Sequence, residues 1–80
     1  MLIHIFRGPG RIFGFTAAAE GSNLPADYGP WSSFKSLDME EGKPQPGVDV
    51  DDCLADVLAY GFHLTDAHFR ITDRAVPNVR

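Results

Sequence analysis

A chain of 80 residues has room for one domain and is too short for two. No stretch approaches the roughly 18 apolar residues of a membrane helix, and a net charge of −4 argues against general nucleic-acid binding. The apolar fraction of 44 % is ordinary for a globular protein and excludes disorder. Cys53 is the only cysteine, so no disulfide can form within the chain. With no export signal at the N-terminus, we expect a soluble, cytoplasmic protein.

The first elements are predicted to form an antiparallel hairpin. Residues 2–6 are branched or aromatic apart from His4 and indicate a buried strand. Residues 7–11 read Arg-Gly-Pro-Gly-Arg, in which proline followed by glycine is typical of a type II turn. Residues 11–16 alternate and indicate the second strand. Because type II turns fit tight hairpins poorly, we expect a connection longer than two residues.

Residues 17–30 are rich in Gly, Pro, Asn and Asp and indicate a loop, part of which is expected to form a short helical turn after Asn23. Residues 31–39 fit either a strand or a helix. We favour a strand, because prolines and glycines flank this segment and no helix cap precedes Trp31.

A helix is predicted over residues 50–60. Asp49 is a suitable N-cap, and Asp51 and Asp52 fall in the first turn, where the helix dipole favours anions. Gly61 is expected to end the helix in the left-handed conformation. Apolar residues at helical spacing predict the buried stripe: Val50, Leu54, Val57 and Leu58.

A final half-buried strand is predicted over residues 67–72, after a turn or bulge at Thr65 and Asp66. The fold class is therefore α+β, with strand-strand-strand-helix-strand order and one helix on one face of a small antiparallel-rich sheet of three to four strands. Residues 1–75 are assigned to this single domain and residues 76–80 to a frayed tail.

The sequence contains no motif for catalysis, a cofactor or a metal. The acidic run at residues 49–52 does not match an EF-hand loop and is interpreted as a helix start. Cys53 is interpreted as a buried apolar residue rather than a nucleophile. The alternative is a small enzyme or metal-dependent protein in which His63, Asp66 and His68 converge at a turn, although no histidine pair has the spacing of a helical zinc site.

The favoured hypothesis is a non-enzymatic interaction or regulatory module with an unknown protein partner or a second copy of the chain. Tyr28, Trp31 and Phe34 are candidate interface anchors, although we favour the interpretation that Trp31 and Phe34 close the core of a small domain. Acidic residues concentrate between positions 38 and 56, whereas arginines lie near both ends. If Arg7, Arg11 and Arg70 share one sheet, they would support salt-sensitive self-association or a weak contact with an anion or nucleic acid.

Overall fold

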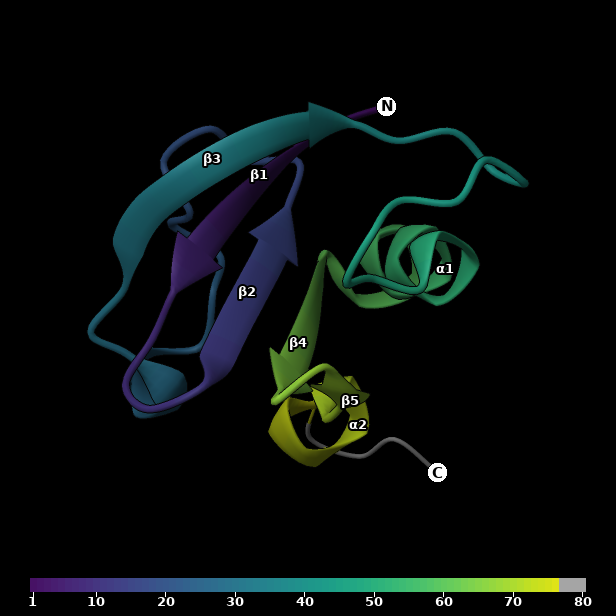
Figure 1. Cartoon of the computed structure of the whole chain (residues 1–80). Helices are drawn as coiled ribbons and strands as arrows, with labels where there is room; N and C mark the ends of the chain where they lie inside the picture. Colours follow the sequence, from purple (N-terminus) through teal and green to yellow (C-terminus); the bar gives the residue numbers. More distant parts are fainter. Residues whose placement is uncertain (77–80) are drawn as a thin grey trace.

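The computed structural model describes residues 1–76 and shows one five-stranded antiparallel sheet with a single long helix against one face (Figure 1). The strands are β1 (Leu2–Arg7), β2 (Ile12–Thr16), β3 (Ser32–Asp38), β4 (Phe62–Asp66) and β5 (Phe69–Arg70). Their order across the sheet is β3-β1-β2-β4-β5. The helices are α1 (Val50–Tyr60), the short α2 (Thr72–Ala75) and the 3-10 turn η1 (Ala26–Tyr28). The predicted α+β class is confirmed, with one strand more than expected.

The N-terminal hairpin forms as predicted. Strands β1 and β2 pair antiparallel with Ile5 opposite Phe15. The connection is four residues long, and the amide of Gly8 donates to the carbonyl of Ile12 at 2.8 Å. Gly10 has a φ of 67°, the left-handed conformation that the Pro-Gly pattern predicted.

Residues 32–38 form a strand, which resolves the strand-or-helix ambiguity. Strand β3 pairs antiparallel with β1, and Ile3 lies opposite Leu37. The register shifts between Ile5 and Phe6, which marks a β-bulge. Strand β3 therefore ends the sheet on one side, next to the N-terminal strand (Figure 1).

Helix α1 has the predicted ends, and the structure buries three of the four residues of the predicted stripe: Val50, Leu54 and Val57. The amide of Asp52 donates to the side chain of Asp49 at 3.0 Å, and Gly61 has a φ of 93°. Leu58, expected in the buried stripe, is 75 % exposed, whereas Asp56 is only 3 % exposed. Successive helical residues are rotated by roughly 100°, so Leu58 lies beyond Leu54 on the helical projection, on the side away from Asp56. The buried face is displaced toward Asp56, and Leu58 is left outside it.

The C-terminal strand prediction was wrong in position. The chain forms β4 over residues 62–66 and turns at Ala67 and His68, whose φ values are 54° and 73°. A two-residue turn with both φ values positive is usually marked by Asn-Gly, so the pair Ala-His gives no turn signal. Ile71 then leads into α2. Most of the predicted frayed tail lies outside the described residues.

The sheet separates two apolar cores. The first lies between the sheet and α1, and its buried members are Ile3, Ile5, Phe15, Met39, Val50, Cys53, Leu54 and Val57. The second lies on the opposite face under the loop between β2 and β3, and its buried members are Phe6, Leu24, Leu64 and Ile71. Within residues 1–76, no helix is both long enough and apolar enough to cross a membrane.

The orientation of α1 predicts contrasting effects of two leucine substitutions. Leu54→Ala should lower the free energy of unfolding by about 2–5 kcal/mol, because it leaves a cavity in the first core. Leu58→Ala should change it by less than about 0.5 kcal/mol, because that side chain is exposed. Urea midpoints measured at constant m-value test the pair. Equal losses in the two variants would mean that the helix is rotated differently.

Candidate functional site

A buried carboxylate connects α1 to the last two strands. Arg70 of β5 donates two hydrogen bonds to Asp56 of α1, from Nε to Oδ2 at 2.9 Å and from the terminal nitrogen to Oδ1 at 2.7 Å. His63 of β4 donates from Nδ1 to Oδ2 of Asp56 at 2.7 Å. The side chains of Asp56 and His63 are 4 % and 2 % exposed, whereas that of Arg70 is 44 % exposed. We call Asp56, His63 and Arg70 the carboxylate cluster.

The cluster keeps Asp56 ionised. Burial alone would raise the pKa of Asp56, but the hydrogen bonds from Arg70 and His63 outweigh it and hold that pKa below its ordinary value. The hydrogen bonding between Arg70 and Asp56 also raises the pKa of Arg70 above its ordinary value. The fork of two parallel bonds matches the planar guanidinium to the carboxylate, a geometry that lysine cannot provide.

Beside the carboxylate cluster, Ile71 and Thr72 form hydrogen bonds with the backbone of Leu64 at the outer edge of β4. The amide of Leu64 donates to the hydroxyl oxygen of Thr72 at 2.8 Å, and the amide of Ile71 donates to the carbonyl of Leu64 at 2.8 Å. The ring of His63 packs against that of Phe15 at a centroid distance of 5.2 Å. Nδ1 of His63 and both carboxylate oxygens of Asp56 are therefore used within the fold, and the ring of His63 is enclosed by protein.

The alternative in which His63, Asp66 and His68 converge is not formed in this geometry. His63 points to Asp56, while the exposed ring of His68 makes a hydrogen bond through Nδ1 to the carbonyl of Gly47 at 2.9 Å. Asp66 pairs with Phe69 at the end of the hairpin. Within residues 1–76, no group of three or more His, Cys, Asp or Glu side chains is arranged to hold a metal ion.

Sequence reasoning missed Asp56 because it counted this residue only as part of the acidic middle of the chain. One signal was present: on the helical projection Asp56 lies about 60° from Cys53, at the margin of the apolar side. An acid at such a position needs a buried partner, and His63 lies seven residues further along the chain.

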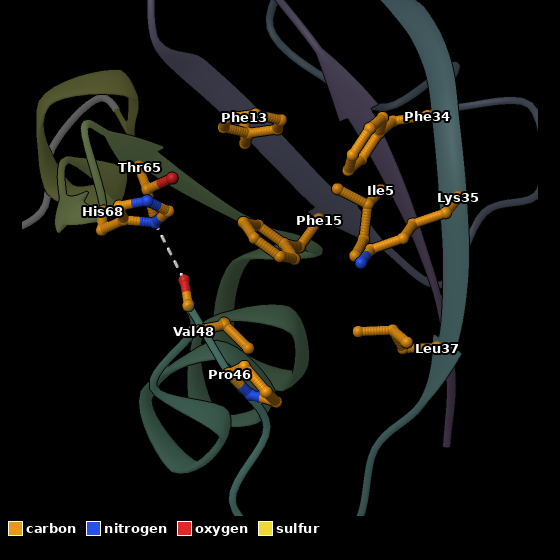
Figure 2. Close-up of a pocket in the computed structure, with 11 residues that line it drawn as sticks. Ile5, Phe13, Phe15, Phe34, Lys35, Leu37, Pro46, Val48, Thr65 and His68 are labelled. Carbon is orange, nitrogen blue, oxygen red and sulfur yellow. Dashed lines mark hydrogen bonds between the residues drawn. The ribbon is translucent and has the colours of Figure 1, made fainter.

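An apolar groove lies on the α1 face of the sheet, beside the helix. It encloses a cavity of about 110 Å³ between the sheet and the segment that leads into α1, with side chains from both directed into it (Figure 2). We call it the sheet groove. Its apolar walls are Ile5, Phe13, Phe15, Phe34 and Leu37 from the sheet, and Pro46 and Val48 from that segment.

At one end of the sheet groove, the cationic groups of Arg7 and Lys35 lie over aromatic rings. The guanidinium carbon of Arg7 lies 4.7 Å from the ring centroid of Phe34 and 5.6 Å from that of Phe13. The ammonium of Lys35 lies 5.4 Å from the ring centroid of Phe34. Phe34 is 45 % exposed, so this end of the sheet groove combines exposed aromatic surface with positive charge.

The remaining candidate residues are distributed over different parts of the fold. Tyr28 and Trp31 pack half-buried against the second core, and the indole Nε1 of Trp31 donates to the carbonyl of Pro25 at 3.0 Å. Arg11 is exposed in the first hairpin turn, next to β2. Arg70 is engaged with Asp56, which leaves Arg7 as the arginine of the set at the sheet groove. The interaction surface named from the sequence stays a prediction.

No protein family model matches the chain, and no curated protein or solved structure matches it significantly. The site is therefore interpreted from its own geometry.

The carboxylate cluster predicts an acid-sensitive contribution to stability. The folded-state pKa of Asp56 lies below the value of about 4 of an unfolded aspartate. The contribution of ionised Asp56 to the free energy of unfolding is therefore complete above about pH 4, and it is lost as the pH falls through the folded-state pKa. Asp56→Asn should lower the free energy of unfolding by about 2 kcal/mol at pH 7. This loss is smaller than the loss for a fully buried ion pair, because Arg70 is half exposed. It should also lose less stability than the wild type between pH 6 and pH 3.

Urea unfolding at a series of pH values measures this difference. Asp27→Asn is the matched control, because Asp27 is exposed in η1. An identical pH dependence in the wild type and Asp56→Asn would contradict an ionised Asp56 in the cluster.

The thiol of Cys53 is predicted to be unreactive in the folded protein. Burial, together with the negative charges of Asp56 and Asp49, raises the pKa of Cys53 to about 12. Because the thiolate is the reactive form, alkylation by iodoacetamide at pH 7 should be slow in buffer and fast in denaturing urea. N-acetylcysteine in the same two solutions corrects for the effect of urea. Equal corrected rates would show that Cys53 is accessible.

Proposed function

We propose that the protein is a non-enzymatic binding module whose sheet groove takes one aliphatic side chain of a protein partner. The observation that carries the proposal is the apolar cavity of about 110 Å³ beside the exposed ring of Phe34. Apolar cavities of comparable size, roughly 150 Å³, hold one small hydrocarbon such as benzene. The space therefore suits a single branched side chain better than an extended substrate.

The polar groups around the sheet groove support binding rather than catalysis. Lys35 and His68 are the titratable residues that line it, and His68 is held by the carbonyl of Gly47. Catalysis requires an acid or base positioned together with a second group that orients it. The carboxylate cluster has such a pair in Asp56 and His63, but its hydrogen bonds serve the packing of α1 and β4.

The charges at the groove favour a partner that carries a carboxylate. Arg7 and Lys35 stand over Phe34, whereas the acidic run of residues 49–52 lies at the start of α1. Opposite charge at the rim increases the association rate and the specificity more than the affinity. A second copy of the chain would satisfy the same chemistry through its acidic segments, and a nucleic acid would satisfy the charge but not the apolar cavity. The single buried thiol suits a cytoplasmic location.

A leucine-like carboxylate tests the sheet groove directly. 4-Methylpentanoate should cause saturable amide shifts at residues 34–37, 47 and 48 in heteronuclear NMR spectra, and 3-methylbutylamine should bind more weakly because its charge is positive. Val48→Trp should abolish these shifts by filling the groove. Leu58→Trp makes a similar change on the exposed side of α1 and should leave them intact.

Shifts that persist in Val48→Trp would contradict binding in the sheet groove. A complete absence of saturable shifts in the wild-type protein would contradict the proposed function.

A further inference from the structure

The outer edge of β3 is free for pairing along its length. Strand β3 lies at the end of the strand order and pairs with β1 alone, and within residues 1–76 no backbone hydrogen bond reaches its other edge (Figure 1). At the opposite side of the sheet, β4 is covered by β5 and by the hydroxyl of Thr72. One edge of the sheet is therefore covered, and the edge formed by β3 is free.

The register identifies which backbone groups face outward. Met1 and Met39 exchange hydrogen bonds, the amide of Met39 donating to Met1 and the terminal amine of Met1 donating to the carbonyl of Met39, both at 2.8 Å. Hydrogen-bonded pairs alternate along an antiparallel ladder, so Leu37 and Lys35 also point their amides toward β1. Ser36, between them, directs its N–H and C=O to the free edge.

Lys35 disfavours pairing of this edge with a second copy of the chain. It is the middle residue of the seven in β3. In a symmetric antiparallel pair centred on the strand, Lys35 would face Lys35 of the other molecule, and like charges directly opposite each other are destabilising. An acidic residue opposite Lys35 is favourable for the same reason.

We propose that β3 binds an extended peptide segment of a partner protein as an added antiparallel strand, with an aliphatic-x-acidic sequence on the face of the sheet groove. The residue opposite Ser36 exchanges two backbone hydrogen bonds with it. The preceding aliphatic residue lies beside Leu37, which lines the sheet groove, and the following acidic residue lies beside Lys35. The inference rests on the proposed function, because the aliphatic side chain is the one placed at the sheet groove.

Two short peptides and one pair of variants test the inference by NMR titration. N-acetyl-Thr-Leu-Thr-Glu-Thr-amide should bind the wild type more tightly than N-acetyl-Thr-Leu-Thr-Lys-Thr-amide. Ser36→Pro removes the outward N–H while keeping the bonds to β1, since edge strands accept proline where its nitrogen faces solvent. It should weaken the glutamate peptide at least about fivefold. Ser36→Ala removes the same side-chain contact with His4 without removing the N–H and should bind like the wild type.

A charge reversal provides a second readout that does not depend on proline. Lys35 is exposed, and Lys35→Glu should reverse the preference, so that the lysine peptide binds more tightly than the glutamate peptide. An unchanged preference would overturn the pairing register.

The two proposals fail in different ways. If 4-methylpentanoate binds but the glutamate peptide binds Ser36→Pro as tightly as Ser36→Ala, the edge inference is wrong and the sheet groove remains a binding site. If neither 4-methylpentanoate nor the glutamate peptide binds the wild type, both the proposed function and the edge inference are wrong.

Discussion

The ion pair between Asp56 and Arg70 determines how α1 sits on the sheet. A carboxylate buried without partners would cost several kcal/mol, so the helix can turn Asp56 inward only where Arg70 and His63 meet it. This requirement selects one rotation of the helix, the one in which Cys53 and Val57 are buried and Leu58 is exposed. The apolar pattern alone predicted most of this face, but it placed Leu58 inside and did not include Asp56. The ion pair therefore contributes to a unique packing as well as to stability.

The position of the partners also determines where α1 lies across the sheet. His63 is on β4 and Arg70 on β5, so the helix packs mainly against β4, away from β3 (Figure 1). On the same face, β1 and β3 are covered by the segment that precedes α1. This segment does not cover them completely. The sheet groove is the space that remains, and its exposed ring, Phe34, lies at the side of the sheet that has the free edge.

Local signals in the sequence predicted the local structure, and tertiary pairing decided the rest. The cap at Asp49 and the glycine at position 61 predicted both ends of α1, since each acts within one helical turn. The turn at Ala67 and His68 carried no such signal and was missed, which displaced the last strand. The carboxylate cluster was also missed, because its members are brought together by the fold of β4 and β5 on α1. The candidate histidine site failed for the same reason: sequence proximity suggested partners that the strands direct elsewhere.

The second face of the sheet is covered by a loop held through close contacts with glycines. A Cβ at Gly14 would lie 2.9 Å from Leu24, and one at Gly21 would lie 2.8 Å from Phe6, so loop and sheet meet at these positions without side chains between them. The loop therefore fits the sheet only with its present length. Inserting or deleting a residue in segment 17–31 would move Leu24 out of its packing position in the second core. Gly42, by contrast, has open space around it. In divergent members of a lineage, differences in chain length should therefore accumulate around Gly42, in segment 40–44, and be rare in segment 17–31.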